Sequence, residues 1–182
     1  KATDSDGIAS VALQYQLVNP GDYIALSDPR YPNQWTTLAM RDDGLAGDAA
    51  AGDGIYTVVL PGSLQTHRRL VRYRIGATDA LGATSAAPDS NDPQPNFAYF
   101  VYNDVPAWTG KATPTSPIVT YGSELLQSVA TYHLLTTGQA HEQAQSIPNS
   151  TAGQYGGSDY LWEGALVYDG EVYDHIRYRA RG

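Results

Sequence analysis

A loop between residues 41 and 57, RDDGLAGDAAAGDGIYT, carries the residues best suited to holding a cation. Asp43, Asp48 and Asp53 recur every five residues, and Asp42 precedes the first of them. Calcium takes roughly six to eight oxygen ligands, and glycines let backbone carbonyls turn towards an ion. The spacing is neither that of an EF-hand nor that of the calcium-binding nonapeptide repeat. Two interpretations stay open, namely one calcium site or separate turns that each aspartate caps.

The same loop is not suited to cradling a phosphate group. A P-loop combines its glycines with a Lys that is followed by Ser or Thr, because the cation and the backbone amides hold the anion together. The loop has no Lys, and its carboxylates would repel phosphate. It is therefore expected to be the long connection between two strands.

A second acidic group combines residues that are far apart in the sequence. Asp4 and Asp6 belong to the phrase DSDG, and Asp79 ends a predicted strand. The topology of a β-sandwich could bring these three residues together at one end of the sheet. They form a second, weaker candidate calcium site, which would make a junction between modules rigid. The alternative is that they make ordinary strand-end turns.

No catalytic residue is predicted. The sequence has no Cys, and its histidines are far apart and lack the spacing of a zinc site. These histidines, His67, His133, His141 and His175, are expected on the surface or in a hairpin. Ser158 lacks the flanking glycines of a nucleophile elbow.

Carbohydrate binding is an alternative function because of the aromatic residues near the end of the sequence. Tyr155, Tyr160 and Trp162 lie within eight positions of one another, and their rings could stack on sugar rings. Alternating aromatic residues on strands more often belong to a core.

Composition excludes several classes of protein. The chain has 182 residues, a net charge of −8 and 42% hydrophobic residues, so it is expected to fold and to have no general affinity for nucleic acid. It contains no apolar run of 18 residues, so no membrane span is predicted. Abundant Tyr, Thr, Gly and Asp favour an exported bacterial protein, located outside the cell or on its surface. The first residue is Lys1 rather than Met, so a longer parent polypeptide is expected.

The front half of the sequence reads as a series of strands. Ile8–Val18 alternates, with Val11 and Leu13 on one face and Gln14 and Gln16 on the other. Further strands are predicted at Tyr23–Leu26, Trp35–Met40, Ile55–Leu60, Arg68–Asp79 and Phe97–Asn103. The Pro-, Asp- and Asn-rich stretch 80–96 is expected to be a loop. The strand spacing without a helical period predicts an antiparallel sandwich.

The back half follows a change of composition. Residues 105–117 are rich in Pro, Thr and Gly and are interpreted as a linker. The predicted fold class is therefore mainly β: an immunoglobulin-like or fibronectin-like sandwich over residues 1–104, the linker, and a small α+β segment over residues 118–182. That segment is expected to contain a strand at 128–136, a helix at 138–147 and a hairpin turning at Asp169-Gly170.

The final hairpin carries a family resemblance. ALVYDGEVYDHIRYRARG resembles the entry segment of the CotH family of atypical kinases, which precedes their nucleotide-binding core. The phrases DSDGIASV, AGDGIYT and VRYRIGATD resemble a bacterial immunoglobulin-like module. Together the two resemblances cover residues 3–103 and 107–182.

The resemblance implies a function for the parent protein more than for this chain. In the CotH family the catalytic and metal-binding residues follow the Arg-x-Arg-Gly phrase, which here ends at Gly182. The chain is thus expected to be a non-catalytic structural or adhesive module, stabilised by calcium. The accessory part of a kinase is the alternative. Expected partners are other domains of the same polypeptide, surface proteins or glycans.

Overall fold

The computed structural model describes residues 1–145 and 160–179 and is mainly β, with antiparallel sheets and a few short helices. The predicted fold class is confirmed at this level. The strands are β1 (Ile8–Val18), β2 (Thr36–Met40), β3 (Arg69–Asp79), β4 (Thr84–Ala87), β5 (Phe97–Val101), β6 (Trp108–Gly110), β7 (Val119–Tyr121), β8 (Tyr132–Leu135), β9 (Trp162–Tyr168) and β10 (Glu171–Tyr178). The helices are α1 (Arg30–Asn33), η1 (Gly62–Leu64), α2 (Ser123–Gln127) and α3 (Gly138–Gln145).

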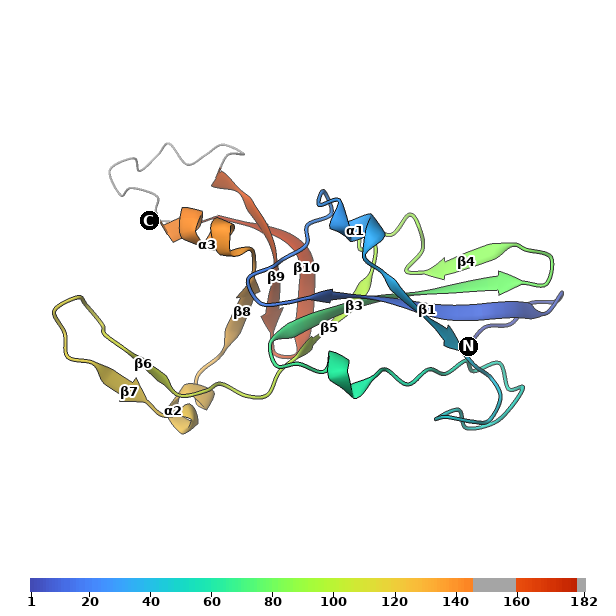
Figure 1. The fold of residues 1–182 in the computed structure, drawn as a ribbon, viewed down its shortest axis with the longest axis horizontal. Coiled ribbons are helices and arrows are strands. Elements are labelled where there is room, and N and C mark those ends of the chain that lie inside the picture. The colour runs from blue at the N-terminus through green and yellow to red at the C-terminus, as the bar shows by residue number, and fades with distance from the viewer. Residues whose placement is uncertain (146–159, 180–182) are drawn as a thin grey trace.

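The first sheet is built on the long strand β3. Its order is β2-β1-β3-β4, and β5 also pairs with β3. The strand β4 pairs with the second half of β3, from Ile75 to Thr78, whereas β5 pairs with the first half, from Arg69 to Tyr73. The strands β4 and β5 therefore follow one another along the same side of β3 (Figure 1).

The second sheet has the order β10-β9-β8, and the predicted hairpin forms its larger part. The turn between β9 and β10 places Asp169 at φ 50° and Gly170 at φ 79°. Two successive positive φ angles are those of a type I′ turn, whose twist matches that of the strands, and Asp-Gly is a preferred pair there.

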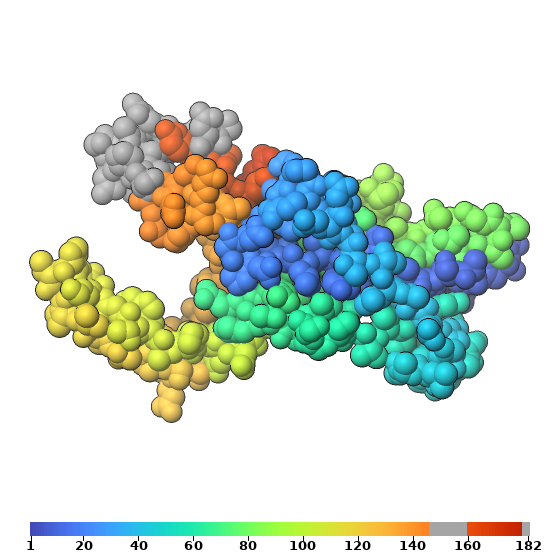
Figure 2. Space-filling model, in the orientation of Figure 1, coloured from blue at the N-terminus to red at the C-terminus, as the bar shows by residue number. Residues whose placement is uncertain are grey.

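A small arm projects from the rest of the molecule. The strands β6 and β7 pair only with each other among the described residues, and α2 follows them. Trp108 stacks on Tyr121 with a centroid distance of 5.8 Å, but both side chains are exposed. Figure 2 shows the arm standing apart, with a hollow between it and α3. Residues predicted as linker thus include the strand β6.

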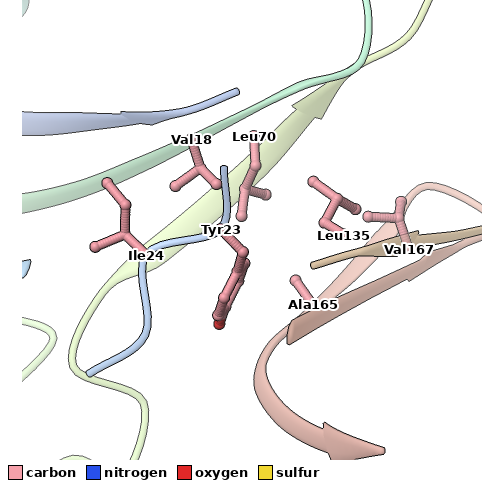
Figure 3. Packing of buried hydrophobic residues seen from close by; sticks show 7 residues of the cluster. All are labelled: Val18, Tyr23, Ile24, Leu70, Leu135, Ala165 and Val167. Carbon is pink, nitrogen blue, oxygen red and sulfur yellow. The ribbon is translucent and has the colours of Figure 1, made fainter. Parts of the chain in front are cut away.

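One hydrophobic core joins the two sheets (Figure 3). The first sheet contributes Val18 and Leu70, while β8 and β9 contribute Leu135 and Val167. The cluster contains Val18, Tyr23, Ile24, Leu70, Leu135, Ala165 and Val167. Burying a side chain of this size stabilises a fold by roughly 1.5–3 kcal/mol. Segments on both sides of residues 105–117 therefore depend on the same core.

Both faces of the first sheet contain buried residues. Val11 and Leu13 are buried on the face that the alternation predicts. On the opposite face, Gln16 and Arg72 are buried as well. That face lies against the core that the second sheet and the loop after β1 complete, so its polar residues are enclosed rather than solvated.

Two predicted strands are not strands. Tyr23–Leu26 forms no ladder, because Tyr23 and Ile24 are drawn into the core between the sheets. Ile55–Leu60 does not resume the sheet, and only the single bridge between Arg41 and Thr57 joins it to neighbouring backbone. In Tyr23–Leu26 the apolar residues indicated burial, which does not require pairing. In Ile55–Leu60 even burial is incomplete, since Ile55 and Val59 are exposed.

One predicted loop contains a strand. Within the stretch 80–96, Thr84–Ala87 forms β4 against the end of β3. These residues are small and exposed, so their pattern carries no sign of a half-buried strand. The pairing follows instead from the tight connection after Asp79, whose carboxylate accepts hydrogen bonds from the backbone N–H groups of Leu81 and Ala83.

Candidate functional site

The acidic loop after β2 brings three carboxylates together. The bridge between Arg41 and Thr57 closes the loop at its base. Within it, one carboxylate oxygen from each of Asp42, Asp48 and Asp53 lies within 4.8 Å of the other two. Calcium–oxygen distances of roughly 2.3–2.6 Å place ligands on opposite sides of an ion about that far apart. The spacing of the three groups fits one calcium ion.

Asp42 also holds the fold of the loop. Its carboxylate accepts hydrogen bonds from the backbone N–H groups of Gly52, Asp53 and Gly54, at 2.7, 3.1 and 2.9 Å. The positive φ angles of Gly52 and Gly54, 75° and 79°, let the chain wrap around this carboxylate. Asp42 is therefore a central residue of the loop.

Asp48 is the most enclosed member of the group. Its side chain accepts a 2.6 Å hydrogen bond from the backbone N–H of Gly44 and lies 3.4 Å from the Thr57 hydroxyl. Only 8% of Asp48 is exposed, and no cation of the chain pairs with it among the described residues. Because a carboxylate has about four acceptor positions, its two donors leave room for a metal bond.

Asp43 lies outside this group, contrary to the set of ligands expected from the sequence. Its carboxylate accepts a hydrogen bond from the Leu45 backbone N–H at 3.0 Å and lies 3.6 Å from the Arg41 guanidinium. The regular spacing of five residues does not describe the geometry, since the loop is made of several tight turns. Asp42 takes the place that Asp43 was expected to fill.

The second acidic group comes together as the sandwich topology predicts. One carboxylate oxygen from each of Asp4, Asp6 and Asp79 lies within 4.8 Å of the others. Register places Asp79, the last residue of β3, opposite Ile8 at the start of β1. Asp4 also caps its own turn, accepting a hydrogen bond from the Asp6 backbone N–H at 2.9 Å. Both interpretations of this group therefore have a structural basis.

The two acidic groups lie at the same end of the first sheet. The N-terminal segment touches the acidic loop directly, since the backbone N–H of Ala2 donates to the carbonyl of Gly54 at 2.9 Å. Figure 1 shows the N-terminus beside this loop, away from the second sheet. Six aspartates thus gather at the end of the molecule opposite the hairpin.

A buried ion pair lies at the other end, where the two sheets meet. Arg72 of β3 is fully buried, and its Nε and Nη2 atoms donate to the two carboxylate oxygens of Asp174 at 2.7 and 3.0 Å. The Nη1 atom donates to the Gln16 side chain and to the Ile24 carbonyl, at 2.9 and 2.8 Å. All three guanidinium nitrogens are therefore satisfied inside the protein.

Further polar groups complete the surroundings of Asp174. The Tyr23 hydroxyl and the Asn96 amide donate to its carboxylate at 2.9 and 3.2 Å. The Nε2 atom of the neighbouring His175 lies 2.9 Å from the side-chain oxygen of Asn96. No buried side-chain nitrogen or oxygen in the described residues lacks a partner. In this arrangement, called the Arg72–Asp174 cluster below, each buried polar side chain has a partner inside the protein.

The electrostatics of the cluster match this reading. Burial on its own raises the pKa of Asp174, but the hydrogen bonds and the charge of Arg72 outweigh it and hold the pKa below its usual range. Burial lowers the pKa of His175 to about 4, while the charge of Asp174 opposes that change. Burial also raises the pKa of Tyr23. At neutral pH the carboxylate is charged and the imidazole is neutral.

Sequence reasoning did not find this cluster. Arg72 was predicted on the face of its strand opposite Val71, with no role assigned, and His175 was expected among surface or hairpin residues. His175 is indeed in the hairpin, but it is largely enclosed and has a φ angle of 56°. The one local signal is that Arg72 lies two positions from Leu70, on the same face of the strand as that apolar residue. The partner lies 102 positions away, beyond the reach of pattern arguments.

The structure describes two of the three aromatic residues considered for sugar binding. Tyr155 lies outside the described residues, and Tyr160 is partly buried. The Trp162 indole N–H donates to the Gln143 side chain at 3.1 Å, and its ring lies 6.0 Å from that of Tyr178. Trp162 is thus engaged within the chain.

The longest helix of the described residues, α3, has eight residues, so none of their helices is able to cross a membrane. Comparison of the chain with protein-family models, with curated proteins and with solved structures gave no match.

Proposed function

We propose that this chain is a non-catalytic, extracellular structural module that calcium stabilises, and that it spaces or presents other domains of a bacterial surface protein. The observation that carries the proposal is the placement of two aspartate triads at one end of the first sheet. A cation in the triad that contains Asp79 ties the N-terminal segment to the end of β3, and a cation in the triad that contains Asp48 ties together the turns of the loop after β2. Each removes conformational freedom from the segments that it joins.

The rest of the structure supports a mechanical role. Arg72 and Asp174 tie the first sheet to the hairpin, and every polar atom of this pair is occupied by a structural partner. The two ends of the module are then stabilised by different interactions. The Arg72–Asp174 ion pair stabilises one end, and calcium from the extracellular medium, where it is commonly millimolar, stabilises the other.

Thermal unfolding in calcium and in chelator tests the proposal. We expect the melting temperature to rise in millimolar calcium, because a ligand at about 100 times its Kd stabilises the native state by about 2.7 kcal/mol. For a chain of this length each kcal/mol raises the melting temperature by about 2–4 °C. Magnesium at the same concentration is the control, since it prefers a smaller octahedral site. An unchanged melting temperature in calcium would contradict the proposal.

The accessory part of a CotH-type kinase is a second candidate. It is motivated by the resemblance of the hairpin sequence to that family, and Asp169-Gly170 does form the turn of the hairpin β9–β10. Phosphate transfer from labelled ATP, measured on the parent polypeptide with and without Arg72→Met and Asp174→Leu together, tests this candidate. A parent without transferase activity would contradict it.

A further inference from the structure

The strand β8 is an open edge of the second sheet. In residues 1–145 and 160–179 its backbone is bonded to β9 alone. Its residues, Tyr132 to Leu135, include neither Pro nor a carboxylate or ammonium group that would protect the edge. Unpaired N–H and C=O groups of such a strand are a template for another strand.

A groove follows this edge. A cavity of about 260 Å³ is lined by the consecutive residues 132–138 on one side, and by Pro20, Gly21, Arg68 and Phe100 on the other. Successive side chains of a strand point to opposite faces. A cavity that touches all of them in turn therefore lies beside the edge of the strand, and not over one face.

The groove continues beyond the start of β8. A second cavity of about 320 Å³ shares Phe100 and His133 with the first. It runs past Tyr102 to the hairpin turn at Asp169 and Gly170. The rings of Phe100 and Tyr102 lie 4.9 and 4.6 Å from that of His133. Because Val167 and Tyr168 of β9 also line the second cavity, it lies over the end of the second sheet, next to the cavity beside β8. Together the two cavities offer space beside β8 and a neighbouring site lined by aromatic rings.

The groove carries an unpaired positive charge. Arg68 is exposed, and its guanidinium makes no hydrogen bond or ion pair within the described residues. Its backbone is held in the left-handed region, at φ 66°, where its N–H donates to the Val101 carbonyl at 2.6 Å. The guanidinium of Arg68 makes the cavity beside β8 complementary to a carboxylate, whereas Asp169 lies at the far end of the second cavity.

We propose that the groove binds an extended acidic segment of a partner protein, which adds to β8 as a further strand while one of its carboxylates pairs with Arg68. Backbone hydrogen bonds to an open edge supply affinity in this mode, and the flanking cavities select alternate side chains. The Arg–carboxylate pair sets register, because its geometry is fixed and bidentate.

Selection from a library of random octapeptides displayed on phage, against the immobilised whole chain, tests the proposal. We expect enriched peptides to carry Asp or Glu at one fixed position between alternating β-branched residues. A synthetic copy of the best peptide should bind at least 10 times more weakly to Arg68→Gly. Its affinity for Arg68→Lys should lie between those for Arg68→Gly and the wild type, because Lys keeps the charge but not the bidentate geometry. Gly suits the positive φ angle at this position, so this variant should fold. Lys111→Ala is the matched control, since Lys111 is an exposed cation that lines neither cavity, and this variant should bind normally.

Two changes to the peptide separate strand addition from a simple charge contact. Replacing its acidic residue by the amide should weaken binding to the wild type as much as Arg68→Gly does, and should add no further loss in that variant. Methylating alternate backbone nitrogens should abolish binding, since those N–H groups pair with β8. Failure to enrich acidic peptides, or binding unaffected by Arg68→Gly or by methylation, would overturn the proposal.

A second copy of the chain is the rival occupant. Sedimentation of the chain alone should show a monomer at the concentrations of the binding experiments. A dimer that the peptide does not dissociate would mean that β8 pairs with itself, and would overturn the proposal. Loss of peptide binding with an intact response to calcium would separate this failure from that of the proposed function.

Discussion

Carboxylates serve opposite ends of this protein in different ways. Asp174 is buried, and its carboxylate accepts hydrogen bonds from the Arg72 guanidinium, the Tyr23 hydroxyl and the Asn96 amide. Asp48 is almost as enclosed, with 8% exposed, but its donors are one backbone N–H and one distant hydroxyl. The first carboxylate has a positive charge supplied by the fold, and the second has none.

The difference lies in what balances the charge. Removing a carboxylate from water is costly unless an opposite charge or several hydrogen bonds replace the water. Arg72 provides that balance internally, and so closes the interface between the sheets permanently. The loop of Asp42, Asp48 and Asp53 gathers negative charge without a cation, which makes its stability depend on the solution. Three predictions test this contrast.

The largest effect is expected from Asp174→Ala. This change leaves the Arg72 guanidinium buried without its counter-charge, and breaking such a pair costs about 3–5 kcal/mol. Urea unfolding followed by Trp fluorescence should show a correspondingly lower midpoint. Calcium should still raise the stability of the variant, because both aspartate triads remain.

Two controls sharpen this prediction. Arg72→Met combined with Asp174→Leu removes both charges and should recover most of the lost free energy of unfolding. Asp22→Ala removes an exposed partner of Arg30, 2.8 Å from its guanidinium, and should cost less than about 1 kcal/mol. If Asp174→Ala cost no more than Asp22→Ala, the contrast between the two ends would be lost.

An intermediate effect is expected from Asp48→Asn. It keeps an acceptor for the Gly44 N–H but removes one charge from the triad, so the calcium-dependent rise in melting temperature should fall by more than half. Asp43→Asn is the matched control, because Asp43 lies outside the triad. Asp79→Asn reports on the second triad in the same assay. Equal calcium responses in all three variants would mean that neither triad holds the ion.

A third effect is expected from pH, and it is confined to acidic conditions. The pKa of His175 is about 4 in the native state, against an ordinary value of 6.5. Between these two pH values His175 is protonated in the unfolded chain but neutral in the native state. The free energy of unfolding therefore falls as pH drops from about 6.5 to 4. Below that range the lowered pKa of Asp174 continues the loss in the same direction.

The variant His175→Asn tests this assignment. Asn tolerates the positive φ angle of 56° at this position. The slope of unfolding free energy against pH between 6.5 and 4 should decrease. Part of the slope should remain, because burial also lowers the pKa of His133. His141→Asn, at an exposed position of α3, is the control. An unchanged slope in His175→Asn would show that this imidazole does not cause the pH dependence of stability.

Local patterns predicted the parts of the fold that depend on local physics. Alternation in β1 identified a strand whose Val11 and Leu13 are buried, and Asp169-Gly170 identified the hairpin turn. Patterns failed where pairing was set elsewhere. Nothing in Thr84–Ala87 is hydrophobic enough to indicate a strand, and the buried Tyr23 and Ile24 indicated a strand that does not exist.

The candidate sites show the same division. The loop residues Asp48 and Asp53, and the distant group completed by Asp79, were found because aspartates between glycines and at strand ends are conspicuous. Asp42 was ranked below Asp43, since spacing along a chain does not reveal which way neighbouring side chains point. The Arg72–Asp174 cluster was missed altogether because it exists only after two distant strands meet.

That distance has a consequence for how the molecule forms during synthesis. A ribosome adds residues from the N-terminus, so β3 emerges with Arg72 well before Asp174 has been made, 102 positions later. Until then the first sheet carries an exposed apolar surface at Val18 and Leu70, and Arg72 lacks its counter-charge. The core between the two sheets cannot form until the hairpin has been made. Folds dominated by contacts between distant residues reach their native state slowly. The nascent front half is therefore the stage at which this protein is most open to aggregation or to capture by chaperones.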